Sequence, residues 1–172
     1  MKSTILNLFL IGFATVTLIS CDGEDIFGGG SEAEAALSEA YVNAEAAANT
    51  IYAYVDLSLR DSTLTGPQDT STIQGATVYI EASGDYVVDF GNGVVGTDGV
   101  TRKGSIIFSA SDKVITTGAT VSATLSNYSR DDKPVQGALT LTVKSANMST
   151  QEVTVGVQIL NFNFNNEFTF SA

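Results

Sequence analysis

Apolar and polar residues alternate along most of this chain, and the period of the alternation changes near residue 75. From there onward, apolar residues occupy every second position in seven short stretches separated by turn residues. This pattern is typical of strands with one buried face. No helix-length segment lies between the stretches, so we expect the strands to pair antiparallel. The apolar members of the seven stretches are Val78 and Ile80; Tyr86, Val88 and Phe90; Ile106 and Phe108; Val121, Ala123 and Leu125; Leu139, Leu141 and Val143; Val153, Val155, Val157 and Ile159; Phe168 and Phe170.

Residues 31–61 follow a different pattern, with apolar side chains at three- and four-residue steps in an alanine-rich segment. This spacing predicts one long amphipathic helix. Its apolar stripe either packs against the chain's own sheet or presents a surface to a partner, and we favour the first interpretation. The stripe consists of Leu37, Tyr41, Ala44, Ala48, Ile51, Val55 and Leu59.

Together the two patterns predict an α+β fold, in which a long N-terminal helix precedes an antiparallel β-sandwich-like domain of about seven strands. We place the helix at 31–61, a linker rich in turn-forming residues at 62–74 and the β domain at 75–172. Two packed layers are the simplest way to bury seven one-sided strands, with the helix covering one side or edge.

The first 20 residues predict an export signal. Lys2 precedes a 15-residue apolar run without charge, residues 5–19, which is the layout of a signal peptide and falls short of the roughly 20 residues that a membrane-spanning helix needs. The ending Leu18-Ile19-Ser20-Cys21 resembles the lipobox of bacterial lipoproteins. That resemblance implies cleavage between Ser20 and Cys21 and a lipid on the Cys21 sulfur. The alternatives are a buried free cysteine or an ordinary secreted signal, and we favour lipidation because Cys21 is the only cysteine.

Residues 21–30 predict a flexible acidic and glycine-rich linker. Asp22, Glu24 and Asp25 resemble the acidic export signal that follows the lipidated cysteine in surface-exposed lipoproteins of Bacteroidota type, although a solvated linker explains them equally well. The expected location is the outer membrane, with attachment through acyl chains on Cys21 and exposure at the cell surface left open.

Composition excludes several functions. The formal net charge is −11, and a chain this acidic lacks the clustered Lys and Arg that bind phosphate backbones, so no nucleic-acid partner is expected. Histidine and tryptophan are absent. The missing histidine removes the usual general base and metal ligand. No cofactor is implied.

The segment 89–104 is the most distinctive part of the predicted β domain. Asp89-Phe90-Gly91, Asp98-Gly99, Arg102 and Gly104 resemble an uncharacterised group of Bacteroidota-type lipoproteins, as do Asn127-Tyr128 and Val135-Gln136-Gly137 further on. The resemblance spans about residues 31–160 and implies a long helix followed by a β body, without any known activity. Members often carry one cysteine in the strand before this hairpin and another within its loop. This chain has Ala76 and Val94 near those places, so that disulfide cannot form here.

The same segment contains the candidate surface-loop site. Asp89, Asn92 and Asp98 carry oxygens that could bind calcium, but their spacing matches no calcium motif. We therefore favour the interpretation in which these residues and the glycines form the turn while Arg102 pairs with a neighbouring carboxylate. No metal ligand is assigned.

For function, we expect a lipid-anchored, non-catalytic module that binds a glycan or another envelope protein. One alternative is a structural protein that docks a partner through the helix stripe. A less favoured alternative is a glycan-active enzyme, which would need two carboxylates about 5–10 Å apart in a cleft. Glu81, Asp85 and Asp89 are the clustered acids near predicted strands.

Overall fold

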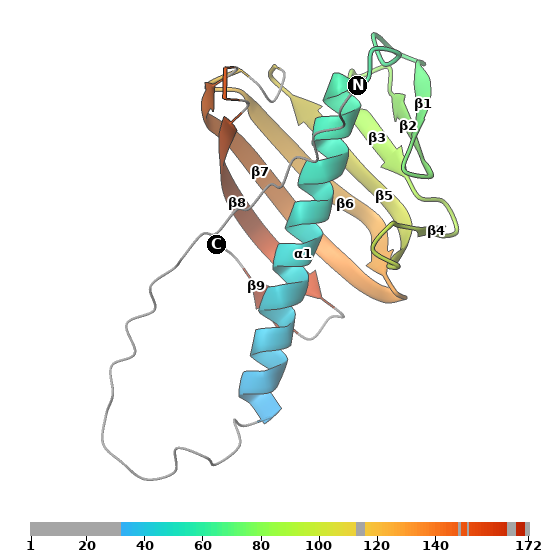
Figure 1. Ribbon diagram of the computed structural model, residues 1–172. Coiled ribbons are helices and arrows are strands. Elements are labelled where there is room, and N and C mark those ends of the chain that lie inside the picture. Colours follow the sequence, from blue (N-terminus) through green and yellow to red (C-terminus); the bar gives the residue numbers. More distant parts are fainter. Residues whose placement is uncertain (1–31, 113–115, 148, 151, 165–167, 171–172) are drawn as a thin grey trace, which may run out of the picture. The chain divides into compact units, whose positions relative to one another are not determined.

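The protein is described by a computed structural model that covers residues 32–112, 116–147, 149–150, 152–164 and 168–170. The predicted signal peptide and the linker 21–30, with Ser20 and Cys21, lie outside the described residues. Within them the chain forms one helix followed by an antiparallel sheet (Figure 1). No helix in this part of the chain is both long and apolar enough to cross a membrane.

The helix α1 spans Glu32–Arg60, close to the predicted range. Its buried positions recur at three- and four-residue steps, as an amphipathic helix requires. They are Ala44, Ala47, Ala48, Ile51, Tyr54, Val55 and Ser58. Tyr41 was expected in this stripe but is exposed. Alanine at three of the buried positions lets the helix backbone approach the sheet closely.

The C-terminal end of α1 is tied to the first strand by one carboxylate. Asp61 follows the helix and accepts hydrogen bonds from the Thr63 backbone N–H at 2.8 Å and the Ser71 hydroxyl at 2.5 Å. These bonds hold the pKa of Asp61 below its usual value. They also determine where the chain turns from helix to sheet.

The nine strands of the described residues form one hydrogen-bonded sheet in the order β1-β2-β3-β5-β6-β7-β8-β9, with β4 paired to β5 outside this path. Every pairing is antiparallel. The strands are β1 (Thr70–Ile73), β2 (Ala76–Ile80), β3 (Tyr86–Asp89), β4 (Val94–Val95), β5 (Thr101–Ala110), β6 (Thr120–Arg130), β7 (Lys133–Asn147), β8 (Glu152–Phe164) and β9 (Phe168–Phe170). The seven predicted strands correspond to β2, β3 and β5 to β9, so the antiparallel β part is confirmed.

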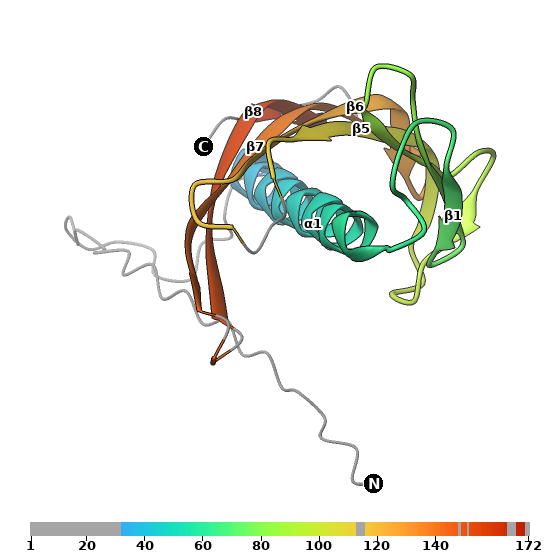
Figure 2. The same ribbon diagram turned by 90° about the horizontal axis from the view of Figure 1, so that it is seen from above.

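The sandwich is not confirmed, because all the described strands belong to a single sheet. Figure 2 shows this sheet curving around α1, which lies along the concave face. The helix and the inward-facing strand residues form one apolar core. The helix therefore covers the apolar face that a second β layer was expected to cover.

Two strands were also missed. β1 lies inside the predicted linker 62–74, and β4 lies inside the predicted turn segment. β1 reads Thr-Ser-Thr-Ile with one buried residue, and β4 has two residues. Neither is long or apolar enough to produce a clear alternation.

A bulge interrupts the pairing of β5 with β6. Lys103 pairs with Ser129 and Ser105 pairs with Ser126, so two residues of β6 lie opposite Gly104. Asn127 and Gly104 both have positive φ, the conformation that glycine and asparagine adopt most readily. The extra residue reverses the alternation of β6. Val121 and Ala123 are buried before the bulge, and Tyr128 is buried after it.

Candidate functional site: a buried arginine between helix and sheet

Arg102 of β5 is the one charged residue that is fully buried within the described part of the chain, with 4% of its surface exposed. It lies at the helix-facing side of the sheet, next to the middle of α1. Burying a guanidinium costs several kcal/mol unless ion pairing and hydrogen bonding compensate. The surroundings of Arg102 therefore decide whether this position is structural or functional.

Asp98 supplies the opposite charge. Its two carboxylate oxygens accept hydrogen bonds from Arg102 Nη1 at 2.9 Å and Nη2 at 2.6 Å, a bidentate arrangement that is among the stronger ion-pair geometries. Asp98 Oδ1 also accepts from the Val100 backbone N–H at 3.2 Å. The hydrogen bond with Arg102 holds the pKa of Asp98 at about 2.

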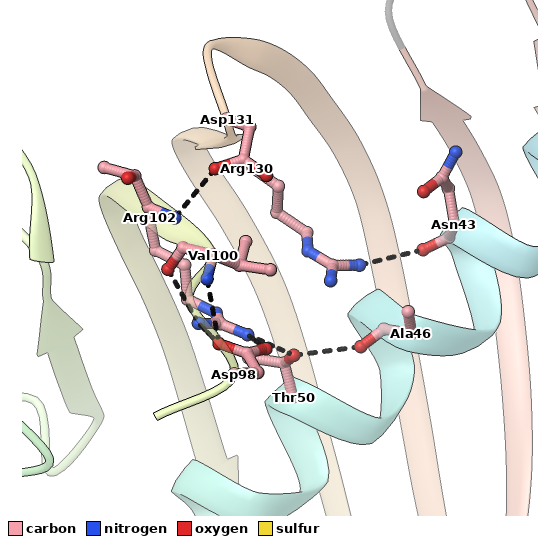
Figure 3. A network of polar contacts seen from close by, with 9 residues as sticks. Asn43, Ala46, Thr50, Asp98, Val100, Arg102, Arg130 and Asp131 are labelled. Atoms are coloured by element: carbon pink, nitrogen blue, oxygen red, sulfur yellow. Dashed lines mark hydrogen bonds and ion pairs between the residues drawn. The ribbon is translucent and has the colours of Figure 1, made fainter. Parts of the chain in front are cut away.

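The helix contributes a further contact. Thr50 of α1 accepts a hydrogen bond from Arg102 Nη2 at 3.2 Å and donates its own hydroxyl proton to the Ala46 carbonyl at 2.9 Å (Figure 3). The guanidinium also donates to the Val100 carbonyl at 3.2 Å. Arg102 thus connects the hairpin that precedes β5 to the helix backbone.

Gly96 makes room for this ion pair. A Cβ atom at this position would collide with Arg102 Nη1 and would lie 2.6 Å from Asp98 Oδ1. The glycine therefore serves close packing of the hairpin backbone against the pair.

A second arginine lies beside the first. Arg130 of β6 is the direct cross-strand partner of Arg102, and Figure 3 shows both guanidinium groups pointing from the sheet toward α1. Arg130 Nη1 donates to the Asn43 backbone carbonyl at 3.4 Å. Like charges at directly opposed positions on one sheet face destabilise the pairing.

A cluster of aromatic side chains lies near the two arginines. Tyr54 of α1 packs edge-on against Phe90 with ring centroids 5.1 Å apart, and Phe90 packs against Tyr128 of β6 at 5.7 Å. Burial raises the pKa of both tyrosine hydroxyls, and Arg102 partly offsets the increase. Both phenols are therefore neutral at physiological pH.

The structure brings only two of the four predicted surface-loop residues together. Asp98 and Arg102 lie together as an ion pair, in agreement with the favoured interpretation. Asp89 accepts from the Gly91 backbone N–H at 2.7 Å and closes the turn, and Asn92 is exposed. Among the described residues, no group of three or more acidic, cysteine or histidine residues is placed to hold a metal ion. The lipidation residue Cys21 and its neighbour Ser20 are outside the described residues.

Thr50, Tyr54, Tyr128 and Arg130 were not predicted as parts of a site. The helix residues belong to a face that the sequence assigns only to packing. Tyr128 and Arg130 follow the bulge, so a simple two-residue period does not place them on the buried face. The one feature of the sequence that could have indicated the bulge is Asn127, because asparagine adopts positive φ more often than most residues.

Comparisons with protein-family models, curated proteins and solved structures gave no match to this chain. The function must therefore be argued from its own residues.

Proposed function

We propose that this chain is a lipid-anchored lipoprotein of the cell envelope, whose helix-filled β module binds a partner without catalysing a reaction. One observation carries the proposal. An uncharged apolar run of 15 residues ends in Leu18-Ile19-Ser20-Cys21, which contains the chain's only cysteine. A cysteine placed directly after a signal sequence is positioned for acylation.

Acyl chains supply the attachment in this proposal. Each buried methylene contributes about 0.8 kcal/mol, and stable anchoring takes at least two chains. The net charge of −11 opposes attraction to an anionic lipid surface. Membrane binding should therefore depend on Cys21 and should resist high salt.

The polar residues support binding more than catalysis. Histidine is absent, and the buried Arg102 is engaged by Asp98 and Thr50. Among the candidate acids, Asp85 accepts a hydrogen bond from the Ser83 hydroxyl and Asp89 closes its own turn. Each of these carboxylates therefore has a local structural partner.

Docking through the helix stripe is the less favoured route to a partner. Ala48, Ile51 and Val55 of the stripe are buried against the chain's own sheet. A partner helix on this stripe would have to displace the core. We therefore assign partner binding to the other surfaces of the module, with a glycan or an envelope protein as the partner.

The anchoring proposal is tested by expressing the full chain with Cys21→Ser and, as the matched control, Ser20→Ala. We expect the native chain and the control to fractionate with membranes and to yield an N-terminal peptide that begins at an acylated Cys21. The Cys21→Ser variant should lose the lipid and leave the membrane fraction. An unmodified Cys21 thiol in the exported native protein would refute the anchor.

The binding proposal needs a separate measurement. The full chain in detergent should be applied to a glycan array and, in parallel, cross-linked in intact envelopes. A saturable glycan signal or a reproducible cross-linked envelope protein would support a binding module. Turnover of any glycan on the array would contradict the non-catalytic assignment.

A further inference from the structure

Four buried polar atoms around the two arginines have no hydrogen-bond partner among the described residues. They are Nε of Arg102, Nε of Arg130 and the hydroxyls of Tyr54 and Tyr128. Buried polar groups are satisfied in most native proteins, so each exception needs an explanation. Four exceptions in one cluster suggest a shared cause.

The four groups belong to one neighbourhood. The Tyr128 hydroxyl is influenced electrostatically by Arg102, Arg130 and Tyr54. Arg102 and Arg130 are direct cross-strand partners. The Arg102 guanidinium is close enough to the Tyr128 hydroxyl to lower its pKa as a hydrogen-bond donor, but the contact is too poorly aligned to satisfy either buried group.

The two arginines also differ in whether a carboxylate contacts them. Arg102 is neutralised by Asp98, whereas Arg130 forms no ion pair within the described residues. The carboxylates at this end of the sheet are engaged elsewhere: Asp132 pairs with Lys103, Glu39 with Lys133, and Asp131 accepts the Thr101 backbone N–H. The Arg130 guanidinium therefore lies at the helix–sheet interface without a carboxylate in contact among the described residues.

We propose that this cluster binds a small inorganic anion, of the size of chloride, between α1 and strands β5 and β6. The two Nε–H groups and the two hydroxyls can all donate a hydrogen bond. An anion accepts from all four and neutralises Arg130, which relieves the repulsion between the paired arginines. A water molecule would satisfy some of the donors but would leave that charge in place.

The anion site does not depend on the lipid anchor or on a partner, so the site and the proposed function can be refuted separately. It is tested on the full chain in detergent by comparing thermal unfolding in sodium chloride with unfolding in sodium gluconate at equal ionic strength. Gluconate is a much larger anion than chloride and should not fit among four buried donor atoms. We expect chloride to raise the melting temperature of the native chain progressively, because a ligand that binds only the folded state stabilises it.

Three variants make the test specific. Arg130→Gln removes the unpaired charge, and Tyr128→Phe removes one hydroxyl while keeping the ring against Phe90. Arg60→Gln is the matched control, because Arg60 is exposed and pairs with Asp56 on the helix surface. The control should keep the chloride effect. The chloride dissociation constant should rise about tenfold or more in Arg130→Gln, since a charge-assisted hydrogen bond contributes affinity of that order.

If Arg130→Gln does not fold, a direct measurement of chloride binding tests the site. Chloride-35 NMR should show line broadening with the native chain and with Arg60→Gln, and reduced broadening with Tyr128→Phe. An equal chloride response in every variant, or no broadening with the native chain, would overturn the site.

Discussion

Asp98 and Arg102 form an ion pair whose partners differ sharply in exposure: the arginine side chain is 5% exposed and the aspartate side chain 47%. The carboxylate can exchange Arg102 for water at little cost, whereas the guanidinium has no such alternative. The two halves of the pair should therefore respond differently to mutation.

Removing the carboxylate should destabilise the fold. Asp98→Asn leaves a buried guanidinium without a counter-charge, and we expect a loss of about 2–3 kcal/mol in the free energy of unfolding. Glu45→Gln, an exposed change on α1 that removes the same charge, serves as the control. Chemical denaturation of both variants measures the difference, and equal midpoints would show that Asp98 does not stabilise Arg102.

Removing the arginine as well should recover part of the free energy of unfolding that Asp98→Asn loses. Met can fill most of the space of Arg102 without a charge, and replacing a buried ion pair by apolar residues is often neutral. We expect Arg102→Met combined with Asp98→Asn to be more stable than Asp98→Asn alone. Denaturation of the double variant tests this, and a double variant that is less stable would mean that packing of the arginine stem outweighs its charge.

The ion pair also predicts a dependence on acid. The pKa of Asp98 is lowered from 3.8 to about 2 in the folded chain, so the folded state favours the carboxylate. The contribution is complete above about pH 4 and declines as the pH falls toward 2. Thermal unfolding of the native chain and of Asp98→Asn should therefore converge across this interval. A stability difference that persists undiminished at the acid end of the interval would contradict the assignment of the shift to Asp98.

Sequence reasoning succeeded where one local pattern determines one local structure. Alternation predicted seven of the nine strands that the structure describes, and three- and four-residue spacing predicted α1. The pairing of Arg102 with a nearby carboxylate followed from turn residues that surround a single arginine. All of these depend on residues within a few positions of each other.

Sequence reasoning failed for features that depend on contacts between residues far apart in the chain. Alternation shows that a strand has one buried face, but it does not show whether a helix or a second sheet covers that face. The bulge at Asn127 reverses the alternation of β6, so Tyr128 and Arg130 were not placed beside Arg102. Thr50 lies 52 positions from Arg102, and only the packing of α1 on the sheet brings them together.

A substitution at Gly104 tests how tightly the backbone packs at the bulge. Gly104 has a φ of +75°, and a Cβ atom at this residue would collide with the Asn127 carbonyl oxygen. We expect Gly104→Ala to cost about 3 kcal/mol, combining backbone strain with overpacking. Gly118→Ala is the matched control, because Gly118 has a φ of +88° and open space around it. It should cost only about 1 kcal/mol. Equal losses measured by denaturation would mean that strain alone determines the cost.

The close approach of α1 to the sheet gives the last prediction. Ala47 has no exposed surface, whereas Ala35 lies exposed to solvent nearer the start of the same helix. Ala47→Leu should force the helix away from the sheet and cost about 1–3 kcal/mol, since a packed core has no room for added methylenes. Ala35→Leu should change stability by less than about 0.5 kcal/mol, because both residues favour helix and the site is exposed. Chemical denaturation of the two variants compares the same substitution at a buried and an exposed position, and equal stabilities would show that α1 does not pack tightly on the sheet.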